Sequence, residues 1–132
     1  MKVVLDTNVL LSATLWHGSV SQKLLAKLIR NNTRIYSSME IIAEYENVLK
    51  RDFEYTNRKI AILVEKILLF STLINPKRLV KIVKADPADD KIVNCAVEAS
   101  AEYIITYDPH LLNLVNYRGT EIITPETAMK KL

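Results

Sequence analysis

Four acidic residues fall at positions that a parallel β-sheet would bring to one edge. Asp6 directly follows the first apolar run of the chain, and Asp108 lies two residues past a later one, Tyr103–Thr106. In an open parallel sheet, ligands bind beyond the carboxyl ends of the strands, so both acids are expected at the same edge. Asp90 would lie in the first turn of the helix that leads into the second of these strands, and Glu44 about two turns into a different helix.

Four carboxylates gathered in one place would repel one another and would resist ionising together. A site of this kind therefore needs a divalent cation, and hard oxygen ligands favour Mg²⁺ or Mn²⁺, as one or two ions. Such ions lower the pKa of a bound water and stabilise the oxygens that enter and leave in phosphodiester hydrolysis. A competing Cys/His metal site is not expected, because the chain offers only His17, His110 and Cys95.

Each acid also has a simpler interpretation. Asp6 could cap the helix that follows the first strand, and Asp108, which precedes a proline, could cap another. Asp90 could interact favourably with a helix dipole, and Glu44 could be an ordinary solvated acid on an amphipathic helix. The spacing of the acids by itself leaves both interpretations open.

The elements that would position these acids alternate between strand and helix. Ser37 followed by Glu40 fits a capping box, Thr56 is a second candidate cap, and Asp86-Pro87, Asp108-Pro109 and Thr124-Pro125 each predict a helix start. We expect strands at 2–6, 33–36, 103–106 and 121–123, a strand or extended segment at 79–83, and helices at 7–16, 19–30, 37–50, 57–74 and 86–101, with shorter ones after 108 and 124.

Alternating strands and helices predict the α/β class, as a three-layer α/β/α arrangement around a central parallel sheet of about four to five strands. The chain shows no internal repeat, low-complexity stretch or linker, so residues 1–132 are expected to form a single domain.

The composition is that of an ordinary globular protein, with 49% apolar and 25% charged residues in 132. A single cysteine excludes an internal disulfide, and no apolar run is long enough to be a signal peptide or a membrane span. A cytoplasmic protein without membrane association is therefore expected. The net charge of +3 is compatible with an anionic partner but does not establish one.

The sequence resembles the PIN-domain family in four ordered blocks. The opening Val3–Leu10 is similar to the apolar strand that runs into Asp-Thr/Ser-Asn, and 38–51 is similar to a block with an acid on a helix after a serine. The stretches 86–90 and 103–108 resemble the Asp-rich helix start and the later strand that ends in Thr-x-Asp. Thr124-Pro125 resembles the end of a toxin-like branch of toxin–antitoxin pairs, the VapC-like branch.

The resemblance implies the metal-binding and catalytic quartet Asp6, Glu44, Asp90 and Asp108, with Asp89 as the alternate to Asp90. Asn8 and Thr106 match positions that support the site by hydrogen bonding. His110 stands where many relatives carry a further acid, which bears on how firmly a second ion is held, and Tyr107 stands where many have glycine.

The resemblance further implies an endoribonuclease that depends on Mg²⁺ or Mn²⁺, with an RNA substrate and an antitoxin protein as partner. Lys50 and Arg51 at the end of the Glu44 helix are candidate phosphate contacts, as is a basic group at Lys23, Lys27, Arg30 and Arg34, although a solvated basic face explains both equally well. The leucine-rich stretch 60–73 could be core or a surface for a second copy, and a homodimer is expected.

Two alternatives remain open at this point. One is a non-catalytic module with the same fold that binds RNA or protein. The other is a phosphoacceptor or phosphatase α/β domain built on Asp6, although a second acid near the first strand and a late lysine, which such domains use, are not evident.

Overall fold

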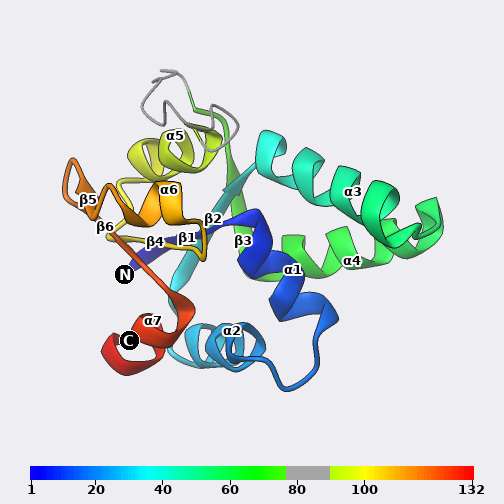
Figure 1. The fold of residues 1–132 in the computed structure, drawn as a ribbon, viewed down its shortest axis with the longest axis horizontal. Coiled ribbons are helices and arrows are strands. Elements are labelled where there is room, and N and C mark those ends of the chain that lie inside the picture. The colour runs from blue at the N-terminus through cyan, green and yellow to red at the C-terminus, as the bar shows by residue number, and fades with distance from the viewer. Residues whose placement is uncertain (77–89) are drawn as a thin grey trace.

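A computed structural model of the protein describes residues 1–76 and 90–132. Within these residues, six strands form one sheet in the order β3-β2-β1-β4-β6-β5, and every neighbouring pair is parallel except β5 with β6 (Figure 1). The strands are β1 (Lys2–Leu5), β2 (Arg34–Ser38), β3 (Ser71–Ile74), β4 (Tyr103–Ile105), β5 (Asn116–Tyr117) and β6 (Thr120–Ile123). The expected α/β class with a mostly parallel central sheet is confirmed, and the sheet is wider than the four to five strands expected.

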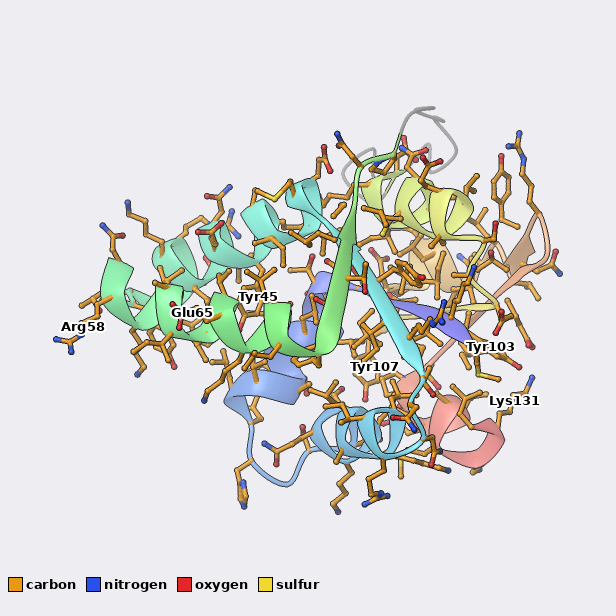
Figure 2. The ribbon with its side chains drawn as sticks, turned by 180° about the vertical axis from the view of Figure 1, so that it is seen from behind. Tyr45, Arg58, Glu65, Tyr103, Tyr107 and Lys131 are labelled. Carbon is orange, nitrogen blue, oxygen red and sulfur yellow. The ribbon has the colours of Figure 1, made fainter. Side chains whose placement is uncertain are left out.

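Helices lie on both sides of this sheet. Figures 1 and 2 show α5 on one side and α2 with α7 on the other, while α3 and α4 form a hairpin that extends away from the sheet. The helices are α1 (Thr7–Leu15), α2 (Val20–Arg30), α3 (Met39–Phe53), α4 (Asn57–Phe70), α5 (Asp90–Ala99), α6 (Pro109–Leu112) and α7 (Pro125–Lys131).

The hydrophobic core is centred on β1, whose Val3 and Val4 are fully buried. A parallel strand covered on both faces needs a continuous apolar run rather than an alternating one, and β1 has that composition. Buried side chains from the neighbouring strands and from α1, α3 and α5 belong to the same cluster. Within the described residues, no helix combines the length and the apolar character needed to cross a bilayer.

The expected helix 57–74 is wrong over its last four residues. α4 ends at Phe70, and Ser71–Ile74 form β3, which pairs in parallel with Ile35–Ser38 of β2. A short apolar run does not by itself distinguish a strand from a helix end. The distant partner β2 decides the outcome.

The hairpin strand β5 was not expected either. A two-residue loop, Arg118 and Gly119, joins β5 to β6, and both residues have positive φ. A turn with this backbone conformation matches the right-handed twist of the two strands that it connects. Arginine is not one of the residues that usually mark such a turn, so the local signal is weak. Two further expectations, the segment 79–83 and the helix start at Asp86-Pro87, lie outside the described residues. The helix expected at 86–101 is present as α5, which ends at Ala99, two residues before the expected end.

The start of α3 corrects a second expectation. Ser38, not Ser37, is its N-cap, and the Ser38 hydroxyl accepts a hydrogen bond from the backbone N–H of Ile41 at 3.3 Å. The capping box from Ser37 to Glu40 does not form, because β2 continues through Ser38 while pairing with β3. The other caps expected from the sequence, Thr56, Asp108 and Thr124, each accept a backbone N–H at their helix start.

Candidate active site

Asp6 lies at the carboxyl end of β1, and its side chain is only 4% exposed. One carboxylate oxygen accepts the backbone N–H of Thr7 at 2.7 Å, which makes Asp6 the N-cap of α1. The other accepts the hydroxyl of Thr106 at 2.6 Å. The simple capping role is therefore real, and the same carboxylate also takes part in a polar group that joins β1 to the end of β4.

The pKa of Asp6 is raised from 3.8 to about 6. Burial is the main cause, since it penalises the charged form, and the hydrogen bonds from Thr106 and Thr7 offset part of that effect. The negative charges of Glu44 and Asp108 raise this pKa further, so both acids lie within electrostatic range of Asp6. A bound cation would relieve this unfavourable charge.

Asp108 follows β4 and is linked to Asp6 through Thr106. The backbone N–H of Asp108 donates to the Thr106 hydroxyl at 2.9 Å, and that hydroxyl donates to Asp6. One oxygen of Asp108 accepts the backbone N–H of His110 at 2.9 Å and so caps α6. Thr106, which is fully buried, thus holds two acids of neighbouring parallel strands in a fixed relation.

Glu44 reaches the site from α3, the helix that begins where β2 ends. Its carboxylate forms an ion pair with the ammonium of Lys91 on α5. Asp90 lies next to Lys91 in the first turn of α5, half-buried, and α5 packs against β1 and α3. Asp89, the alternate to Asp90, lies outside the described residues.

The supporting and substrate residues expected from the sequence fall around this group. Asn8 is exposed near the start of α1. Lys50 and Arg51 are exposed further along α3 than Glu44, and Arg51 is bound to Asp52 through two hydrogen bonds. Lys27 of the other basic group instead donates to the carbonyl of Met129 at 2.8 Å, which leaves it engaged in packing α2 on α7.

Tyr107, next to Asp108, is turned towards α7. Its hydroxyl donates to Glu126 at 2.9 Å, and Figure 2 shows the labelled side chain on the α2 and α7 side of the sheet. On the opposite flank of the site, the hydroxyls of Tyr45 and Thr14 lie 2.7 Å apart and tie α3 to α1. These two contacts hold the helices around the carboxyl edge of the sheet.

The donor atoms of the site suit a hard divalent cation, because they are carboxylate and hydroxyl oxygens. In residues 1–76 and 90–132, however, no three or more His, Cys, Asp or Glu side chains lie close enough together to hold an ion. Asp6 and Asp108 are the two acids already joined through Thr106.

Two residues at the site were not among the site residues expected from the sequence. Lys91 directly follows Asp90, but its pairing with Glu44 depends on how α5 packs against α3. Thr7 is buried beside Asp6, and its hydroxyl has no hydrogen-bond partner among the described residues. Thr7 is part of the Asp-Thr/Ser-Asn block of the family, but only the structure shows that its hydroxyl is buried.

The fold is similar to several solved structures. VapBC2 from Rickettsia felis bound to a DNA fragment from its promoter gives a TM-score of 0.69 at 14% identity, over 94% of this chain and 98% of that one. VapBC-1 from nontypeable Haemophilus influenzae gives 0.66 at 16% identity, over 96% and 99%. PAE2754 from Pyrobaculum aerophilum gives 0.66 at 16% identity, over 99% and 88%.

By sequence, no curated protein matches the chain. The family model of the PIN domain, in contrast, matches residues 2–110. This match spans β1 to the start of α6 and includes every acid of the candidate site. The chain therefore belongs to the PIN-domain family.

Proposed function

We propose that the protein is an endoribonuclease that depends on Mg²⁺ or Mn²⁺, with Asp6, Glu44, Asp90 and Asp108 as its acidic quartet. The observation that carries this proposal is the state of Asp6. Its buried carboxylate is oriented by Thr106 and is destabilised by the charges of Glu44 and Asp108. An arrangement that raises the cost of a buried charge favours binding of a cation.

We assign a separate role to each residue of the site. Asp6 and Asp108 would hold the ion, and Thr106 fixes the orientation of Asp6 while it accepts the backbone N–H of Asp108. Asn8 supports the group by hydrogen bonding. Mg²⁺ or Mn²⁺ held there would supply an activated water and charge stabilisation at the scissile phosphate. Lys50 and Arg51 contact neighbouring phosphates of the RNA and position it without reading its sequence.

We further propose that the protein is the toxin component of a toxin–antitoxin pair. The family membership and the similarity to VapBC structures support this role. In that role the protein would bind an antitoxin protein, would be located in the cytoplasm and would form a homodimer. A short neighbouring reading frame that encodes a small DNA-binding protein would strengthen the proposal.

The direct test is cleavage of single-stranded RNA by the purified protein. Cleavage should occur with Mg²⁺ or Mn²⁺, stop in chelator, and fall by about a hundredfold or more in Asp6→Asn, the scale of losing a group that acts at the reacting centre. Glu65→Gln removes an exposed acid on α4, a helix that carries none of the four acids, and should leave the rate unchanged. Cleavage that continues in chelator would rule out the proposed reaction.

The same assay decides between Asp89 and Asp90. Asp90→Asn should remove activity and Asp89→Asn should reduce it less. A larger loss of activity in Asp89→Asn than in Asp90→Asn would make Asp89, and not Asp90, the member of the acidic quartet.

A non-catalytic binding module is the second candidate. It is favoured by the lack of a ready group of three metal-binding side chains among the described residues. This candidate predicts that the protein binds RNA or an antitoxin without turnover at any concentration of divalent ion.

A further inference from the structure

An ion pair at the candidate site involves a basic residue, Lys91. The ammonium of Lys91, in the first turn of α5, forms an ion pair with the carboxylate of Glu44 on α3. The two side chains are only 20% and 33% exposed, so solvent screens this pair less than it would screen an ion pair on the open surface.

This contact changes what Glu44 can do. A carboxylate that already binds an ammonium is a weaker ligand for a second cation, and the ammonium itself repels a divalent ion held nearby. The structure is consistent with such a restriction, because within the described residues Glu44 does not join Asp6 and Asp108 in a group able to hold an ion.

We propose that Lys91 is a positioning residue that serves as a built-in counter-ion for Glu44 and thereby limits how tightly the site holds divalent metal. This inference rests on the proposed function, since it concerns the same acidic group. In the resting protein, Asp6 and Asp108 carry the primary ion-binding role. Lys91 supplies at Glu44 the positive charge that a further ion would otherwise bring.

The surroundings of the pair allow an ion to compete with Lys91. A surface hollow of about 490 Å³ is lined by Glu40, Glu44, Arg51 and Lys91, together with Ala43, Asn47 and Val48. The pair therefore borders solvent rather than lying in the core. An ion can therefore reach Glu44 from solvent through the same hollow that Lys91 lines.

A structural brace between α3 and α5 is the competing explanation, and it makes a different prediction. If Lys91 is only a brace, its removal lowers folding stability and leaves metal affinity unchanged. If Lys91 is a counter-ion, its removal also raises metal affinity, whereas most mutations in a metal site lower it. Removal of Lys91 should strengthen metal binding, because it frees Glu44 and removes a repelling charge.

The experiment titrates Mn²⁺ into the full-length protein by isothermal calorimetry, with free Mn²⁺ measured in parallel by electron paramagnetic resonance. Lys91→Met should bind Mn²⁺ about tenfold more tightly than the unmodified protein, or bind one more ion, as expected from loss of one nearby charge at partial exposure. Lys91→Arg keeps the cation and should behave like the unmodified protein. Lys130→Met, which removes an exposed lysine on α7, should have no effect.

The double variant Lys91→Met with Glu44→Gln provides the decisive comparison. If Lys91 acts through Glu44, most of the gain in affinity disappears in the double variant. An unchanged or weakened affinity in Lys91→Met, or a gain that persists in full without Glu44, overturns the proposal. In chelator, urea unfolding of the two single variants and the double variant should show that their effects on stability are not additive, and additive effects would contradict the pairing itself.

The outcomes also separate this inference from the proposed function. If the unmodified protein binds Mn²⁺ and cleaves RNA while Lys91→Met binds metal unchanged, only the role of Lys91 fails. If neither protein binds Mn²⁺, both the proposed role of Lys91 and the metal dependence of the proposed nuclease fail. Binding by Lys91→Met alone would support the counter-ion role in its strongest form.

Discussion

At the scale of single residues, the central feature is a carboxylate that serves two purposes. Asp6 caps α1 through Thr7 and also belongs to the acidic group of the candidate site. Its burial makes the charged form costly in the absence of a cation. The pKa difference between 3.8 and about 6 corresponds to about 3 kcal/mol of folding free energy when the group is ionised.

The sign of this effect gives a pH prediction for the metal-free protein. Because the pKa is higher in the folded state, folding favours the protonated acid, and its contribution to stability is lost as the pH rises from about 4 through about 6. In chelator, Asp6→Asn should therefore gain up to about 3 kcal/mol relative to the unmodified protein between pH 4 and pH 7.5. Urea unfolding at both pH values measures this difference.

Thr106→Val is the matched control for that measurement. It removes the hydroxyl whose hydrogen bond lowers the pKa of Asp6, so the unmodified carboxylate should then show a steeper loss of stability with rising pH. An equal difference between Asp6→Asn and the unmodified protein at both pH values would contradict the raised pKa.

At the scale of elements, the start of α3 determines where Glu44 lies. The helix begins directly after β2, and the hydroxyl of Ser38 satisfies the free backbone N–H of Ile41. The hydroxyl of Ser37, one residue earlier, is buried and has no hydrogen-bond partner among the described residues. Two adjacent serines thus have opposite energetic roles, because only one faces the free amides of the helix.

This difference gives a paired prediction. Ser38→Ala should lower the free energy of unfolding by about 1 kcal/mol, the usual cost of losing an N-cap. Ser37→Ala should leave stability unchanged or raise it slightly, because it removes a buried polar atom that makes no hydrogen bond. Chemical unfolding of the two variants is the measurement. A larger loss for Ser37→Ala would restore Ser37 as the cap.

At the scale of the whole molecule, the α4 side of the protein exposes apolar side chains. Leu69 is 87% exposed and Ile62 48% exposed, and Leu68 and Leu73 are also exposed. β3, the strand that follows α4, lies at the edge of the sheet. A cluster of exposed apolar residues on one element is typical of a surface that contacts another protein chain, in keeping with the proposed homodimer.

The oligomeric state provides the test of that proposal. Leu69→Lys places a charge at the most exposed apolar side chain of α4 and should convert a dimer into a monomer, as measured by size-exclusion chromatography with light scattering. Val115→Lys changes another exposed apolar residue, beside β5 at the opposite edge of the sheet, and should leave the dimer intact. A monomer in all three proteins, or a dimer that survives Leu69→Lys, would refute this interface.

Local rules account for what the sequence by itself determined. The apolar run of β1 identifies a buried strand, and Thr56, Asp108 and Thr124 identify helix starts, because a cap depends only on the next three residues. The ordered blocks around the acids identify the family. The positions of Asp6 and Asp108 at strand ends follow from the same local pattern.

The tertiary structure alone decided the features that depend on distant partners. Ser71–Ile74 became a strand through pairing with β2, and that pairing carries β2 through Ser38 and so moves the cap of α3 from Ser37. The contact between Lys91 and Glu44 joins residues on two helices that meet only when both pack at the carboxyl edge of the sheet. Strand pairing and side-chain burial are set by the global packing of the chain, which no local window of sequence contains.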